Sequence, residues 1–142
     1  MQVDNISMGT VVDHIKAGAA SKVMRLLGID EDYPHRVAIV VNVPSKKMKT
    51  KDILKIEGKI VKENEANMIA LVSPGASINI IKDGKIEKKY KVSLPKQASK
   101  HCICPNPNCM THDDTSTVFT LEGKGRYRCH YCERLFDAEE IV

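Results

Sequence analysis

The spacing of hydrophobic and polar positions over the first hundred residues predicts a mixture of strands and helices. A loose alternation over 2–12 predicts a strand that bends at Gly9. Apolar side chains at helical spacing over 18–28 predict a helix, and Gly28 is placed as its C-terminal stop.

The middle of this region predicts two more strands and a second helix. Residues 36–43 are a β-branched run ended by Pro44, which we expect to be a central strand buried on both faces. Residues 52–61 alternate and predict a strand with one solvent-facing side. Helical spacing over 63–72 predicts a helix that ends before Pro74-Gly75.

Two final strands complete the predicted domain. Residues 77–81 and 85–92 flank Asp83-Gly84, a strong hairpin signal. The resulting order is strand, helix, strand, strand, helix, strand, strand. This order predicts an α+β fold of the ferredoxin-like kind, an antiparallel sheet with both helices on one face. We expect its edge strands to be free to pair with another copy.

Four of the five cysteines form two close pairs near the C-terminus, Cys104-Pro-Asn-Pro-Asn-Cys109 and Cys129-His-Tyr-Cys132. Each pair closes a tight loop that directs two sulfurs at one centre. The 19 residues between the pairs are enough for a hairpin that brings the loops together. This spacing predicts a Zn²⁺ ion held by Cys104, Cys109, Cys129 and Cys132. Four protein ligands leave no position for a reactive water, so the predicted site is structural.

Other arrangements of these residues are two disulfides or four neighbouring buried thiols. The polar N-terminus does not resemble a secretory signal, so we expect a cytoplasmic protein in which disulfides are disfavoured. Cys102 is an alternative to Cys104 as a ligand, but the turn between Cys104 and Cys109 favours Cys104, and Cys102 is interpreted as a small strand residue. Further alternative ligands are the nearby histidines His101, His112 and His130.

The segment around the cysteines predicts a small all-β, ribbon-like zinc-binding domain. Residues 118–121, a turn at 123–125 and residues 126–128 form the expected hairpin. Too few apolar residues are present for this segment to fold without the ion. Ser93-Leu-Pro-Lys-Gln97 resembles a connector, and we therefore predict domains at 1–95 and 96–142.

The net charge of +4 is concentrated in two lysine clusters. Residues 45–62 hold seven lysines and two acidic residues, and residues 82–96 hold six lysines and two acidic residues. Such clusters indicate phosphate binding, nucleic-acid binding or a solvated face. Asp13-His14 is open to interpretation as a catalytic dyad, a ligand-binding turn or a helix lead-in. No segment is long and apolar enough to predict a membrane span.

Several motifs together resemble the regulatory chain of aspartate carbamoyltransferase over essentially the full length. They are Gly9-Thr-Val-Val-Asp-His-Ile15, Lys51-Asp-Ile-Leu-Lys-Ile-Glu57, Ser93-Leu-Pro95 and the two cysteine pairs, the second continuing to Glu133. The resemblance implies a non-catalytic chain that regulates an enzyme of pyrimidine biosynthesis. It also implies that the N-terminal domain binds CTP, ATP or UTP and forms a homodimer of regulatory chains. The zinc domain would contact the catalytic chain, in a dodecamer of six catalytic and six regulatory chains.

The resemblance also implies a set of nucleotide-binding residues, carried over position by position. They are Val3, Ile6, Val11, Asp13, His14, Lys55, Asn79, Ile81, Ile86 and Lys89. Within this set Asp13 is the expected ribose partner, His14 and Lys89 are the phosphate partners, and Lys55 contacts sugar and base. Asn5 and Gly84 depart from the family pattern, which bears on base selectivity. In the zinc domain, we expect Asn106 and Asn108 to project toward the catalytic chain.

Two other functions compete with this interpretation. A nucleic-acid-binding zinc-ribbon protein would explain both the cysteines and the lysines. However, the zinc segment interleaves few aromatic residues with its basic ones, and stacking platforms require them. A small metalloenzyme is the other alternative, and a closed set of four thiolates argues against it.

Overall fold

The computed structural model describes residues 6–112 and 117–142, and the chain divides into two compact units, Met1–Ser93 and Leu94–Val142. None of the helices in the described part has the length and hydropathy needed to cross a bilayer. Each unit is described separately below.

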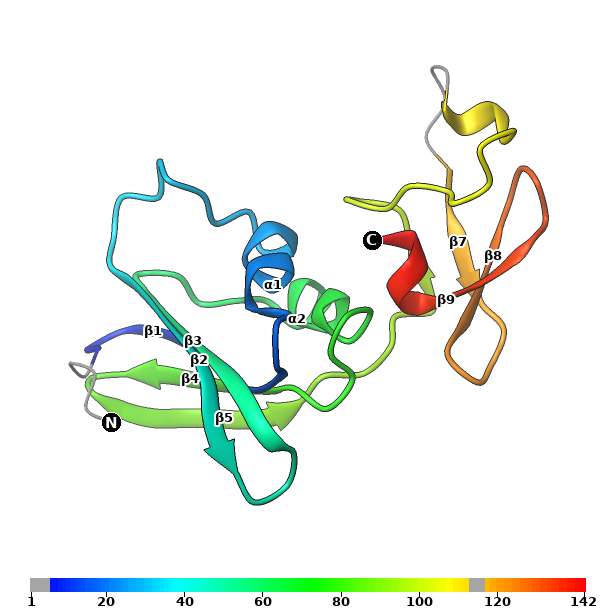
Figure 1. Cartoon of the computed structure of the whole chain (residues 1–142). Helices are drawn as coiled ribbons and strands as arrows, with labels where there is room; N and C mark the ends of the chain where they lie inside the picture. Colours follow the sequence, from blue (N-terminus) through cyan, green and yellow to red (C-terminus); the bar gives the residue numbers. More distant parts are fainter. Residues whose placement is uncertain (1–5, 113–116) are drawn as a thin grey trace. The chain divides into compact units, whose positions relative to one another are not determined.

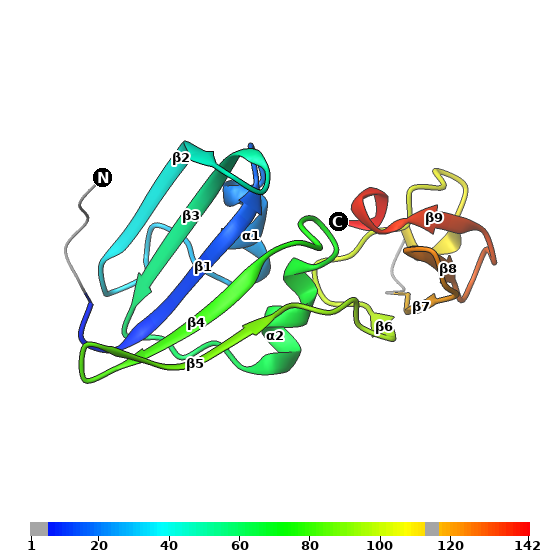
Figure 2. The same cartoon turned by 90° about the horizontal axis from the view of Figure 1, so that it is seen from below.

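The first unit is a five-stranded antiparallel sheet covered on one face by two helices (Figures 1 and 2). Its elements in chain order are β1 (Gly9–Lys16), α1 (Ala20–Leu26), β2 (Val37–Ser45), β3 (Lys49–Glu57), α2 (Glu63–Ile69), β4 (Ser77–Lys82) and β5 (Lys85–Lys91). The strand order is β2-β3-β1-β4-β5. The predicted α+β class, with both helices on one side of an antiparallel sheet, is confirmed.

The core of this unit lies between the helices and the sheet. Its large side chains without exposed surface come from both layers and include Val12, Val23, Leu54, Ile56, Ile69 and Ile78. Burying each such side chain contributes roughly 1.5–3 kcal/mol to folding. Because neighbouring residues on a strand point to opposite faces, residues adjacent to these core positions face away from the helices.

The prediction of a central strand at 36–43 is wrong, because β2 lies at the edge of the sheet. Its side chains Ile39 and Val41 are 45% and 56% exposed, so the strand is buried on neither face. The β-branched run reflects strand propensity, which does not distinguish an edge from a centre. Pro44 lies within β2, and proline in a strand is tolerated at an edge because it lacks the N–H that a second neighbour would need.

Other boundaries differ in smaller ways. The strand predicted over 52–61 runs instead over β3 and ends before Gly58, whose φ of +84° turns the chain. Ile60, outside the strand, is 36% exposed rather than part of its buried face. The predicted helix stop is confirmed, since α1 ends at Leu26 and Gly28 has a φ of +70°. The Asp83-Gly84 hairpin is also confirmed, with positive φ at both residues.

The second unit is a four-stranded antiparallel sheet in the order β6-β7-β8-β9. Its elements are β6 (Gln97–Ala98), the 3₁₀ helix η1 (Met110–His112), β7 (Phe119–Leu121), β8 (Arg126–Cys129), β9 (Leu135–Asp137) and the 3₁₀ helix η2 (Ala138–Ile141). The predicted hairpin is confirmed as β7 and β8. Phe119, Tyr127 and Ile141 form a small core with no exposed surface. The expectation that Cys102 lies on a strand is wrong, because it lies in a loop before the first cysteine pair.

Candidate functional site

The first cysteine pair is held by a turn whose backbone and side chains bond to each other. The Cys109 N–H donates to the Asn106 carbonyl at 3.1 Å, and the Asn108 N–H donates to Asn106 Oδ1 at 3.0 Å. Asn106 is therefore buried, with its amide turned back into the turn, and the expectation that it projects outward is wrong. Asn108 is exposed. The turn brings Cys104 and Cys109 to the same side.

The second cysteine pair begins where β8 ends. The Cys129 N–H donates to the Arg134 carbonyl at 3.0 Å, and the Glu133 N–H donates to the Cys129 carbonyl at 2.9 Å. Glu133 has a φ of +62°, which reverses the chain into β9. This tight loop points Cys129 and Cys132 toward the first pair.

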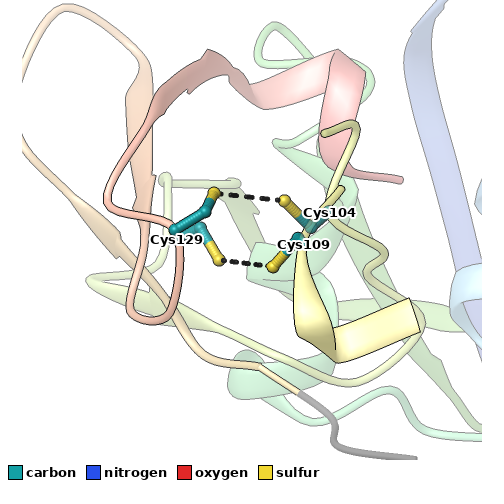
Figure 3. Close-up of side chains that lie close together, drawn as sticks. Cys104, Cys109 and Cys129 are labelled. Carbon is teal, nitrogen blue, oxygen red and sulfur yellow. Dashed lines mark hydrogen bonds between the residues drawn. The ribbon is translucent and has the colours of Figure 1, made fainter. Parts of the chain in front are cut away.

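The four predicted ligand sulfurs lie within 4.8 Å of one another. The Cys104 and Cys132 sulfurs are 3.6 Å apart, and those of Cys109 and Cys129 are 3.8 Å apart. A tetrahedral ion with metal–sulfur bonds of about 2.3 Å requires sulfurs about 3.8 Å apart. A disulfide requires about 2.05 Å. Figure 3 shows the Cys104 and Cys109 side chains facing that of Cys129 across this space.

Burial and hydrogen bonding act on these thiols in opposite directions. Burial raises the pKa of the Cys104 thiol to about 12, with a further contribution from the neighbouring sulfurs. Burial also acts to raise the pKa of Cys129, but hydrogen bonds from the Thr117 hydroxyl and two backbone N–H groups outweigh it and lower that pKa to about 6. Several thiolates at this spacing repel one another, so the set is stable as ligands of a cation.

The alternative ligands lie outside this cluster. In the described part of the chain, the residues grouped for metal binding are the four paired cysteines. Cys102 is half-buried and contacts the Lys100 carbonyl. His101 is exposed, His130 is hydrogen-bonded to Thr120, and the side chain of His112 lies outside the described part. The donor set is thus four sulfurs, which suits a tetrahedral thiophilic ion.

A second candidate site lies on the sheet face opposite the helices. Lys55, Val11, Asn79 and Lys89 are direct neighbours on β3, β1, β4 and β5, and so form one row across the sheet. Ile81 and Ile86 pair in a further row. Six predicted residues therefore share this face.

The Asp13-His14 pair forms an irregularity in β1, where the register with β3 shifts between Val12 and Ile15. His14 has a φ of +56°, and its Nδ1 lies 3.0 Å from Ser77 Oγ. The His14 backbone N–H donates to Asp13 Oδ1 at 2.6 Å. Because the imidazole engages Ser77 and lies 3.9 Å from the carboxylate, the pair does not form a catalytic dyad.

The Asp13 carboxylate is paired with Lys51, which no sequence motif marked as a site residue. Lys51 Nζ lies 2.9 Å from Asp13 Oδ1. Partial burial acts to raise the pKa of Asp13, but the hydrogen bonds from Lys51 and the His14 backbone outweigh it and lower the pKa below its usual 3.8. Asp13 is therefore an anion at neutral pH.

A pocket of about 420 Å³ opens beside His14. It is lined by His14, Lys47, Met48, Gly75, Ser77, Lys89, Tyr90 and Lys91. Of the predicted residues, the pocket contains His14 and Lys89. Ile6 is buried elsewhere in the unit, and Val3 lies outside the described residues.

Lys47 and Lys91 were not predicted individually from the sequence. Both belong to the lysine clusters, which were the available signal. Lys47 lies between β2 and β3, and Lys91 pairs with Ser77 across β4 and β5. Three lysines and a histidine at one pocket suit a ligand with several negative charges.

Comparison with known proteins gives matches over both units. Residues 1–93 match the family "Aspartate carbamoyltransferase regulatory chain, allosteric domain", and residues 99–142 match "Aspartate carbamoyltransferase regulatory chain, metal binding domain".

Full-length relatives agree with these family matches. The chain is 45% identical to the aspartate carbamoyltransferase regulatory chain of Methanopyrus kandleri, over 99% of this chain and 93% of the relative. It is 44% identical to that of Thermococcus gammatolerans (100% and 96%) and 43% identical to that of Sulfolobus acidocaldarius (100% and 89%).

Proposed function

The chain belongs to the family of aspartate carbamoyltransferase regulatory chains, and we propose that it controls this enzyme by binding CTP, ATP or UTP in its first unit. It is a regulatory, non-catalytic chain with an allosteric domain and a metal-binding domain. Its place is therefore in the control of pyrimidine biosynthesis. The observation that carries the proposal is the basic pocket beside His14, because its charge suits a triphosphate.

The geometry of the first unit supports a binding mode in which the phosphates lie in the pocket and the sugar and base lie on the sheet face. His14, Lys47, Lys89 and Lys91 offer donors to a phosphate chain at the pocket. Asp13, an anion at neutral pH, would accept hydrogen bonds from ribose hydroxyls. Lys55 and the apolar Val11, in the same row of the sheet as Lys89, would contact the sugar and base.

The metal in the second unit is Zn²⁺ in this proposal. Zinc accepts four thiolates in a tetrahedron and has no redox chemistry, which suits a site that only holds a fold. The small core around Phe119 and Tyr127 is too limited to stabilise the unit alone. Cysteines kept as thiolate ligands also fit a cytoplasmic location.

The second unit presents apolar side chains suited to contact with the catalytic chain, the partner that the family implies. Ile103, Met110 and Tyr131 are 66%, 61% and 48% exposed, and each lies within two residues of a ligand cysteine. Exposed apolar side chains of this size commonly mark protein interfaces. Loss of zinc would therefore disturb this surface directly.

The first unit has one sheet edge suited to pairing with a second regulatory chain. The β2 edge exposes Ile39 and Val41, whereas β5, at the opposite edge, carries four lysines and one glutamate. Lysine-rich edges resist strand pairing, and apolar edges favour it. We assign the homodimer contact to β2, within an assembly of six catalytic and six regulatory chains.

Calorimetry with CTP, ATP and UTP on the full chain tests the proposed pocket. Replacing Lys89 by Ala removes a charge-assisted hydrogen bond to phosphate, which contributes roughly 1.5–3 kcal/mol. We expect triphosphate affinity to fall by at least about tenfold. Lys88→Ala is the matched control, because Lys88 lies on the same strand over the Tyr90 ring, 5.1 Å from its centroid. Unchanged affinity in Lys89→Ala would place the nucleotide elsewhere.

A further inference from the structure

Two threonine hydroxyls contact the sulfurs of the metal centre. Thr111 Oγ1 donates to Cys109 Sγ at 3.1 Å, and Thr117 Oγ1 lies 3.3 Å from Cys129 Sγ. Thr117 is 4% exposed, and its hydroxyl also lies 3.3 Å from the Val118 carbonyl oxygen. Once Cys129 is a metal-bound thiolate it can only accept, and its negative charge makes it the stronger acceptor for the hydroxyl.

The two hydroxyls serve the same side of the centre. Cys109 and Cys129 face each other at 3.8 Å, so one hydroxyl supports each member of this sulfur pair. Among the described residues, no hydroxyl contacts the sulfurs of the opposite pair, Cys104 and Cys132. The four ligands are all cysteine sulfurs, but hydroxyl groups contact only Cys109 and Cys129 among them in the described part of the chain.

The ligand cysteines also differ in burial, and Cys132, which contacts no hydroxyl of the described residues, is the most exposed of the four. Cys104, Cys109 and Cys129 are at most 5% exposed, whereas Cys132 is only half-buried. A reagent that attacks cysteine thiolates, or a competing metal ion, therefore reaches Cys132 most easily. A ligand that is both accessible and without hydroxyl support dissociates first when the site opens.

We propose that Thr111 and Thr117 are positioning residues that hold Cys109 and Cys129 on the metal, so that the site opens from Cys132. This inference rests on the proposed occupation of the cluster by Zn²⁺. The hydroxyls spread part of the thiolate charge, which lowers repulsion among four sulfurs around one divalent ion. They also restrict the sulfurs to the tetrahedral position. Partners of this kind commonly contribute 10- to 100-fold in metal affinity.

The first experiment measures metal release from the full-length chain. Zinc is released by a mercurial and followed with a chromogenic chelator, in the wild type and in Thr111→Val and Thr117→Val. Valine keeps the shape and burial but removes the donor, so we expect release about 10- to 100-fold faster. Thr111→Ser and Thr117→Ser restore the hydroxyl and should release at the wild-type rate. Thr120→Val is the matched control, because its hydroxyl contacts His130 and no sulfur.

A second measurement reports on the sulfur itself. In the Co²⁺-substituted chain, loss of a hydrogen bond raises the energy of the sulfur lone pair. The sulfur-to-metal charge-transfer band should therefore move to longer wavelength in the valine variants and return in the serine variants. Alkylation of partly opened wild type should modify Cys132 first, and Thr117→Val should add early modification of Cys129.

The outcomes separate this inference from the proposed function. Stoichiometric zinc with equal release rates in wild type and both valine variants would overturn the positioning role and leave the metal assignment intact. Serine variants as fast as the valine variants would also overturn it, because the effect would then be one of packing. A wild-type chain that binds no zinc would remove the metal assignment and this inference together.

Discussion

At the scale of single residues, Asp13 joins several parts of the first unit. Its carboxylate accepts from the His14 backbone and from Lys51, and His14 in turn engages Ser77 beside the pocket. One side chain therefore orders the irregular part of β1, the start of β3 and one wall of the proposed triphosphate site. Replacing it should affect stability as well as nucleotide binding.

The pKa of Asp13 predicts a defined pH dependence. Because this pKa is lower in the folded chain than its usual 3.8, the ionised form stabilises the fold above about pH 4. That contribution is lost as the pH falls through the lowered value. Asp13→Asn should therefore be less stable than wild type at pH 6, with the difference shrinking toward pH 3. Urea unfolding of both proteins across this range measures it, and a constant difference would exclude the ion pair as its source.

The ligand residues of the two sites were predictable to different degrees. Cysteine pairs are local, because a turn of four or six residues alone decides that two sulfurs face the same way. The pocket depends on which residues of separate strands become neighbours. Lys47 reaches it from the connection between β2 and β3, a position that no periodicity in the sequence indicates. Lys55 and Lys89 were each predictable as solvent-facing, because successive side chains on a strand point to opposite faces of the sheet. Their position in one row depends on the pairing of the strands.

At the scale of elements, β2 is the most informative strand because its position was predicted wrongly. A run of valine and isoleucine is compatible with a buried centre or with an apolar edge that a partner covers. Pro44 inside the strand was the available signal for an edge. The apolar edge and the charged β5 edge together indicate where a second chain would pair.

Val41→Lys tests the role of the β2 edge. Val41 is 56% exposed in the single chain, so the substitution should leave the fold intact. A lysine at a paired apolar edge must be desolvated, and we expect the homodimer to dissociate. Sedimentation of the isolated regulatory chain measures this. Glu87→Lys on β5 is the control, and a dimer that survives Val41→Lys but not Glu87→Lys would move the interface to the other edge.

At the scale of the whole molecule, the junction between the two units is short and anchored on both sides. The Ser93 N–H donates to Asn67 Oδ1 at 3.0 Å within the first unit. Within the second unit, the Pro95 carbonyl accepts from the Tyr127 hydroxyl at 2.7 Å. Burial raises the pKa of Tyr127 to about 12, so the hydroxyl keeps its proton for this bond at neutral pH. Each end of the connecting segment is therefore fixed to its own unit.

Removing the metal should abolish binding to the catalytic chain and leave nucleotide binding in place. The cysteine cluster lies wholly in the second unit and the basic pocket wholly in the first. Treating the assembled enzyme with a mercurial and a chelator should dissociate it into catalytic and regulatory parts, as measured by sedimentation. The released regulatory chain should bind nucleotide with nearly the same affinity as it does within the intact assembly. An intact complex without zinc would contradict the proposed role of the metal.

In the proposed function, a nucleotide bound in the first unit changes the activity of a catalytic chain held by the second. Such a ligand acts only through its difference in affinity for two states of the assembly, commonly ~1–3 kcal/mol. The most direct measurement is the aspartate saturation curve of the assembled enzyme with and without CTP or ATP. We expect the curve to shift with wild-type chain, and to shift far less with Lys89→Ala. Curves that are unchanged by saturating nucleotide would contradict a regulatory role for the first unit.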